Sequence, residues 1–120
     1  MLTRAAILGV GVHVPRRVLT NDELAKIVDT SDEWIVERTG IRTRHIAEPD
    51  QAASDLAVPA AHAALDDAGV VPADLDLILC GTTTPDMFFP ATACLVQDRI
   101  GASRAGAMDL LAACSSFVYG

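Results

Sequence analysis

Short apolar runs alternate with longer amphipathic segments along this chain. Runs typical of strands occupy residues 5–12, 41–46, 75–80 and 106–111. The first of them contains Gly9 and Gly11, which predicts a buried strand ending in a tight turn. Pro15 is expected to stop regular strand pairing soon after.

Two short helices are predicted between the first two of these runs. Thr20 precedes Glu23 by three residues, the spacing of a capping box, and the helix is expected to continue to about Val28. The same signal at residues 30–33 opens a second helix. Gly40 is well placed to end that helix in a left-handed conformation.

A longer helix is predicted from an Ala-rich segment whose apolar residues recur on one face. Ser54 is the expected N-cap and Gly69 the expected end. Pro59 cannot donate a backbone hydrogen bond to the Asp55 carbonyl, so we expect a kink there or a later helix start.

The remaining elements alternate between strand and helix. Strand 75–80 leads into a loop at residues 82–85, a helix follows over 91–100, and strand 106–111 turns directly into a last helix at 112–117. This order is typical of an α/β layered sheet with right-handed crossovers. The last helix has no C-terminal cap before Gly120, so we expect a part of a longer protein.

Composition narrows the function classes. The 120 residues are enough for one modest domain, and 51% of them are apolar. A net charge of -7 argues against nucleic-acid binding. No signal peptide is predicted, and no run approaches the roughly 20 apolar residues of a membrane span. Three cysteines without metal-ligand or disulfide spacing favour a cytoplasmic location.

Cys114 lies where a strand is predicted to enter a helix. Backbone N–H groups and the helix dipole favour a thiolate at such a position, which suits a cysteine nucleophile. The alternative is a small buried hydrophobe, the role expected of Cys80 and Cys94. The spacing places none of the three histidines beside this cysteine: His13, His45 and His62.

A second candidate site combines an aromatic ring with positive charge. Thr30, Trp34 and Arg38 are spaced by four residues and are expected on one helix face. A tryptophan with a guanidinium one turn away suits a heterocycle next to phosphates. The alternative is that Trp34 packs in the core while Arg38 pairs with Glu37 or Asp32.

Three segments together resemble the β-ketoacyl-acyl carrier protein synthase III family: VDTSDEWIVERTGIRTRHIA at 28–47, TTTPDMFFPATACLVQ at 82–97 and MDLLAACSSF at 108–117. The match runs in register through essentially the whole chain. The resemblance implies a thiolase-like fold with two similar halves, in a homodimer. Residues 1–120 would form a partial N-terminal thiolase-like domain, a mixed sheet flanked by helices, with the rest of the enzyme outside this chain.

The resemblance also implies roles for single residues. Cys114 would accept an acyl group from acyl-CoA, which then condenses with malonyl-acyl carrier protein at the start of fatty-acid synthesis. Trp34 resembles the residue that stacks on the adenine of coenzyme A, Thr30 its hydrogen-bonding neighbour, and Arg38 a contact near phosphate at the tunnel mouth. Phe89 resembles the residue that closes the partner's acyl pocket across the dimer. Coenzyme A thioester is a substrate here, and no cofactor or metal is implied.

The chain departs from the family pattern at two places. Ser115–Ser116 follows the cysteine where many members have Ala-Gly or Ser-Gly, and the Ser116 hydroxyl is expected to influence primer choice. Pro59 replaces a helix-compatible residue. The family's catalytic His and Asn lie further along the chain, so a polypeptide that ended at Gly120 is expected not to condense anything.

Two other functions stay open at this point. One is a related thiolase-fold acyltransferase of secondary metabolism, which Ser116 slightly favours. The other is an inactive truncated copy that only pairs with a complete subunit. The primer, acetyl or branched, is not specified by these residues.

Overall fold

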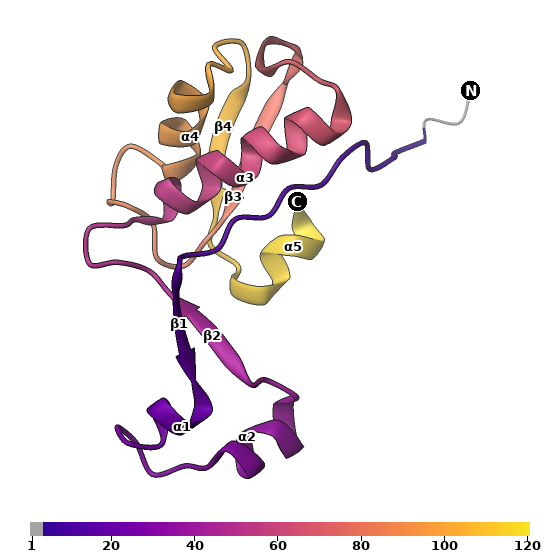
Figure 1. The fold of residues 1–120 in the computed structure, drawn as a ribbon. Helices are drawn as coiled ribbons and strands as arrows, with labels where there is room; N and C mark the ends of the chain where they lie inside the picture. Colours follow the sequence, from indigo (N-terminus) through magenta and orange to yellow (C-terminus); the bar gives the residue numbers. More distant parts are fainter. Residues whose placement is uncertain (1–3) are drawn as a thin grey trace. The chain divides into compact units, whose positions relative to one another are not determined.

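The computed structural model describes residues 4–120, which form two compact units (Figure 1). The smaller unit is Val14–Gln51. The larger unit combines residues 4–13 with Ala52–Gly120.

A strand–helix–strand arrangement organises the larger unit. Strand β3 (Leu77–Gly81) is followed by helix α4 (Thr92–Ile100) and strand β4 (Gly106–Leu110). The two strands pair in parallel, with Leu79 opposite Met108. The α/β order predicted for this part of the sequence is confirmed.

Helices α3 (Ala53–Ala68) and α4 pack together and bury the core of the larger unit (Figure 1). A short 3₁₀ turn, η1 (Pro72–Asp74), leads from α3 into β3. Because side chains alternate along a strand, Ile78 packs on this core while Leu77 and Leu79 face the other side. The buried core residues are Leu65, Val96, Ile100, Ala102 and Ala105.

The ends of these helices follow the sequence signals in part. Gly69 and Gly101 adopt φ values of 64° and 78° and end α3 and α4, as predicted. The prediction of Ser54 as N-cap was wrong: the cap is Ala52, and the Ser54 hydroxyl instead donates to Asp86 at 2.6 Å. Helix α3 also continues through Pro59, so the later helix start is excluded.

The strand predicted over residues 5–12 was wrong. The segment is extended but pairs with neither β3 nor β4, and its backbone runs against α3. A Cβ on Gly9 would lie 2.6 Å from the Ala68 nitrogen, and one on Gly11 would overlap the backbone of α3. Both glycines therefore permit close contact with a helix, and a strand needs a paired neighbour that this segment does not have here.

The smaller unit is a two-stranded antiparallel sheet with two helices. Strand β1 (Arg17–Thr20) pairs with β2 (Thr43–Ile46), and Val18 lies opposite His45. Strand β2 falls within the predicted run at 41–46. Strand β1 was not predicted, because its partner lies far along the sequence.

Two helices connect these strands. The capping box at Thr20 is confirmed, but α1 (Asn21–Leu24) is shorter than predicted. Helix α2 (Asp32–Thr39) ends at Gly40 with a φ of 71°, as predicted. The cap of α2 is Ser31, so the expectation of a cap at residue 30 was wrong by one residue.

The part of the chain that the structure describes contains no helix both long enough and apolar enough to cross a membrane.

Candidate active site

Cys114 lies in a sharp turn immediately after β4. The 3₁₀ turn η2 (Ala113–Ser115) carries the cysteine, and the one-turn helix α5 (Ser116–Tyr119) follows. The sequence predicted a direct change from strand to helix, and the structure inserts this turn. Ala113 adopts a φ of 47°, a left-handed conformation that costs a non-glycine residue about 1–2 kcal/mol.

Buried Ser116 holds the turn in place. Its hydroxyl donates to the Leu110 carbonyl oxygen at 3.0 Å and accepts from the Ala112 amide at 3.1 Å. The hydroxyl is thus used within the turn. A Cβ on Gly81 of β3 would lie only 2.7 Å from the Ser116 Cβ, so the turn packs directly on the end of that strand.

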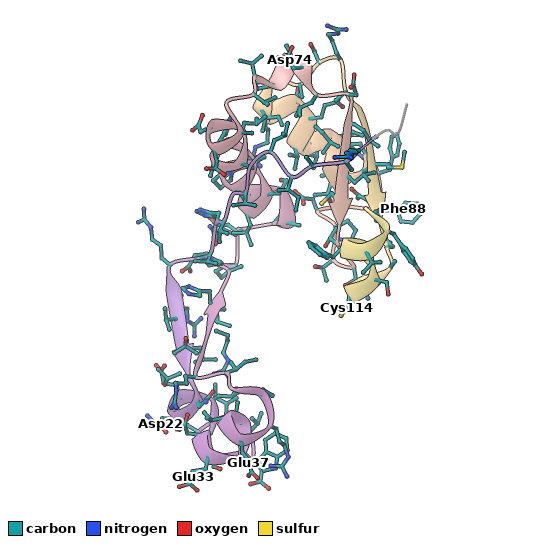
Figure 2. The ribbon with its side chains drawn as sticks, turned by 90° about the vertical axis from the view of Figure 1, so that its right-hand side faces the viewer. Asp22, Glu33, Glu37, Asp74, Phe88 and Cys114 are labelled. Carbon is teal, nitrogen blue, oxygen red and sulfur yellow. The ribbon has the colours of Figure 1, made fainter. Side chains whose placement is uncertain are left out.

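An open hollow of about 730 Å³ adjoins Cys114. Figure 2 shows Cys114 beside α5 at one end of the larger unit, opposite the end that carries Asp74. Cys114 is exposed, so its interpretation as a buried hydrophobe is wrong. The described residues that line the hollow include no histidine: Leu77, Leu79, Gly81, Leu110, Ala113, Cys114, Ser116, Phe117 and Gly120.

The other two cysteines occupy different surroundings. Cys80 on β3 and Cys94 on α4 are half-buried, in agreement with the packing role expected for them. Burial raises the pKa of the Cys80 thiol, and the negative charges of Asp109 and Asp86 raise it further. Cys80 is therefore a poor nucleophile.

Two carboxylates that the sequence analysis did not identify order the start of α4 and the loop before it. Asp109 accepts hydrogen bonds of 2.8 Å from the backbone amides of Thr92 and Ala93, at the start of α4. Asp86 accepts from both the amide and the hydroxyl of Ser54. An aspartate inside the apolar run at 106–111 was the signal that could have revealed the first of them.

The loop between β3 and α4 presents two aromatic rings to solvent. Phe88 and Phe89 are 103% and 83% exposed, and Figure 2 shows Phe88 pointing outward from the larger unit. Asp86 anchors this loop through its bonds to α3 and through the Thr92 hydroxyl, which donates to it at 3.4 Å. The predicted role of Phe89 at a dimer interface remains a prediction.

In the smaller unit, Trp34 and Arg38 lie on one face of α2. The guanidinium of Arg38 lies 4.4 Å from the centroid of the indole ring, and the indole is 52% exposed. Core packing of Trp34 is thereby excluded. Arg38 also contacts Glu37 at 3.8 Å, an exposed pair of the kind considered as the alternative. Thr30 precedes the cap Ser31 and lies outside the helix, so the expectation that it shares a helix face with Trp34 and Arg38 was wrong.

No group of three or more potential metal ligands occurs among the described residues.

No protein-family model matches the chain. A β-ketoacyl-[acyl-carrier-protein] synthase III from Xanthomonas oryzae pv. oryzae is 61% identical to it over 113 residues, which are 94% of this chain and 35% of that relative. The chain is a homologue of β-ketoacyl-[acyl-carrier-protein] synthase III.

Solved structures agree with this homology. A 3-oxoacyl-[acyl-carrier-protein] synthase III from Aquifex aeolicus is 51% identical, with a TM-score of 0.88 over 94% of this chain and 36% of that one. The priming β-ketosynthase of the R1128 polyketide pathway is 42% identical, with a TM-score of 0.89 over 94% of this chain and 34% of that one. The predicted thiolase-like α/β fold is confirmed.

The chain spans about a third of the length of the synthase III relatives that it matches. Homology supports the resemblance found in the sequence, whereas the roles of Cys114, Trp34, Arg38 and Thr30 remain predictions. In the described structure, Cys114 belongs to the larger unit and the other three to the smaller one.

Proposed function

We propose that the complete protein is a β-ketoacyl-acyl carrier protein synthase III that starts fatty-acid synthesis. The proposal rests chiefly on one observation: an exposed cysteine occupies a braced strand-to-helix turn beside a hollow, in a chain 61% identical to such a synthase. Residues 1–120 would supply the nucleophile and part of the coenzyme A site.

The first step is an acyl transfer to Cys114. The thiolate attacks the carbonyl carbon of a short acyl-CoA, the carbon–sulfur bond to coenzyme A breaks, and coenzyme A leaves as a thiolate that takes up a proton. The small residues Ala113 and Gly81 line the same hollow as Cys114 and leave space for the thioester.

The second step forms a carbon–carbon bond. Malonyl-acyl carrier protein loses carbon dioxide, and the resulting carbanion attacks the acyl carbonyl on Cys114. The cysteine thiolate leaves, and β-ketoacyl-acyl carrier protein is released. This step needs stabilisation of developing negative charge, which we assign to residues outside these 120.

The smaller unit would bind the nucleotide of coenzyme A. The half-exposed indole of Trp34 offers a face to adenine, and Arg38 offers positive charge to phosphate. Thr30, next to the N-cap of α2, would add a hydrogen bond.

In a homodimer, exposed Phe89 would close the acyl pocket of the partner. A cytoplasmic location and the docking of malonyl-acyl carrier protein belong to the same proposal.

Mass spectrometry of the intact protein tests the first step. After incubation with acetyl-CoA, the complete protein is expected to gain the mass of one acetyl group. Cys114→Ala should abolish this gain and Cys94→Ala, the matched control, should retain it. Acetylation that persists in Cys114→Ala would refute the assignment. Release of carbon dioxide on adding malonyl-acyl carrier protein tests the second step.

A second candidate function is acyl transfer in secondary metabolism. The likeness to the R1128 priming β-ketosynthase, at a TM-score of 0.89, favours a secondary pathway, although a ketosynthase is itself a condensing enzyme. An enzyme that passes the acyl group to an oxygen or nitrogen acceptor would load Cys114 in the same way but would release no carbon dioxide. The measurement of carbon dioxide therefore separates a condensing enzyme from a non-condensing one.

A further inference from the structure

Asn21 is the most completely buried polar side chain of the smaller unit, at 1% exposure. Its amide nitrogen donates to the Asp32 carboxylate at 2.7 Å and to the Ile41 carbonyl oxygen at 2.8 Å. Its amide oxygen accepts from the Arg44 guanidinium at 2.6 Å. Both amide hydrogens and the oxygen therefore have partners, as a buried amide requires.

The partners of Asn21 lie at the two ends of one helix. Asp32 is the first residue of α2, and Ile41 immediately follows its left-handed cap, Gly40. Arg44 lies on β2 and also donates to the Leu19 carbonyl oxygen on β1 at 3.2 Å. A single side chain thus connects both ends of α2 to the strand pair.

This connection matters because α2 is short and weakly buried. Among its residues only Ile35 is buried, so apolar packing alone constrains the helix little. The Trp34 ring and the Arg38 guanidinium both project from this helix, 4.4 Å apart. A rotation of α2 about its axis would move both groups together.

We propose that Asn21 is the positioning residue of the Trp34–Arg38 pair, and that its hydrogen bonds hold α2 in the orientation that binds the nucleotide of coenzyme A. The inference rests on the proposed function of this pair. Asn21 touches no substrate in this role, since it is buried and acts only through α2.

Asn21→Asp tests this role while it keeps the size of the side chain. The new carboxylate faces the Asp32 carboxylate and the Ile41 carbonyl oxygen with no hydrogen to donate, while the contact with Arg44 remains. The dissociation constant for coenzyme A in the complete protein is expected to rise about tenfold or more, because both hydrogen bonds that Asn21 donates are lost. Fluorescence of Trp34 on titration with coenzyme A reports this constant, with Trp34→Phe as the background.

A small thioester separates positioning from general destabilisation. Acetyl-N-acetylcysteamine lacks the nucleotide, so its kcat/KM should stay within about twofold in Asn21→Asp while that for acetyl-CoA falls. Val96→Ala, a core change in the larger unit, serves as the control and should affect both substrates equally. Equal losses in Asn21→Asp, or unchanged binding of coenzyme A, would overturn the proposal.

A double variant keeps the test decisive if Asn21→Asp does not fold. Asn21→Asp with Asp32→Asn restores a donor between the two positions and should recover part of the affinity for coenzyme A. The double variant still lacks the hydrogen bond to the Ile41 carbonyl oxygen. If it folds and binds coenzyme A as tightly as the wild type, that result also counts against a positioning role for Asn21. If Trp34→Ala binds coenzyme A normally, the proposed nucleotide site itself is wrong, whereas failure of the Asn21 variants alone refutes only the positioning.

Discussion

The hydroxyl of Ser116 donates a hydrogen bond of 3.0 Å to the carbonyl oxygen of Leu110, and so joins the end of β4 to the start of α5. Cys114 lies between these two residues. The position of its sulfur therefore depends on a hydrogen bond that the sulfur does not make.

Ser116→Ala is expected to loosen this turn. The change leaves the Leu110 carbonyl and the Ala112 amide without their partner, at a cost of about 1–3 kcal/mol in the free energy of unfolding. Displacement of the sulfur should slow acetylation of Cys114 about tenfold or more. Thermal unfolding and a time course of the mass gain measure the two effects. Unchanged rates would show that the turn holds its shape without the hydroxyl.

Gly81→Ala is expected to disturb the same turn from the neighbouring strand. The added Cβ would lie 2.7 Å from the Ser116 Cβ, and neither atom can move without its backbone. Acetylation of Cys114 should fall, and the melting temperature with it. Adding Ser116→Gly removes the opposing Cβ, so the double variant should acetylate faster than Gly81→Ala and at a rate similar to Ser116→Gly alone. If the double variant acetylated no faster than Gly81→Ala, the contact between the two Cβ atoms would not be the cause of the slower acetylation.

The sequence predicted the elements whose signals are local. Gly40, Gly69 and Gly101 end their helices in left-handed conformations, and Thr20 forms its capping box with a residue three positions away. Each of these effects involves neighbours within one helical turn. Local signals of this kind can be recognised without knowledge of the fold.

Elements that depend on distant partners could not be predicted in the same way. Strand β1 exists because it pairs with β2, and Ser54 is not a cap because Asp86, 32 residues away, binds its hydroxyl. The strand-to-helix position of Cys114 was predictable from neighbouring residues, whereas the packing of Ser116 against Gly81, 35 residues earlier in the chain, was not. The buried hydrogen bonds of Asn21 also join positions far apart in the chain.

Selective alkylation should distinguish the cysteines. Cys114 is exposed, whereas burial and the charges of Asp109 and Asp86 raise the pKa of the half-buried Cys80 thiol. Since the thiolate is the reactive form, iodoacetamide near pH 7 should label Cys114 well before Cys80. Peptide mapping after brief labelling measures the order. Asp109→Asn should speed labelling of Cys80 and leave that of Cys114 nearly unchanged, and equal labelling of both in the wild type would contradict this account.

Acid should remove a stabilising contribution made by Asp55 at the start of α3. Its carboxylate accepts from the Ala52 amide and from the Arg99 guanidinium, both at 2.9 Å, and these bonds lower its pKa below the ordinary value of 3.8. A carboxyl pKa that is lower in the folded state stabilises the protein above the unfolded value, and the gain disappears as the pH falls through the folded value. Asp55→Asn should therefore melt below the wild type at neutral pH, and the difference should shrink below about pH 4.

The matched control for this prediction is Asp98→Asn, which removes the same charge from the surface of α4. Its melting temperature should differ little from that of the wild type at any pH in the series. Because the side chains of Asp55 and Arg99 are 36% and 42% exposed, added salt should also reduce the Asp55→Asn difference at neutral pH. If the difference in melting temperature between Asp55→Asn and the wild type stays constant from neutral to acidic pH, the charge of Asp55 contributes nothing to stability. Only the hydrogen bonds that its side chain accepts would then matter.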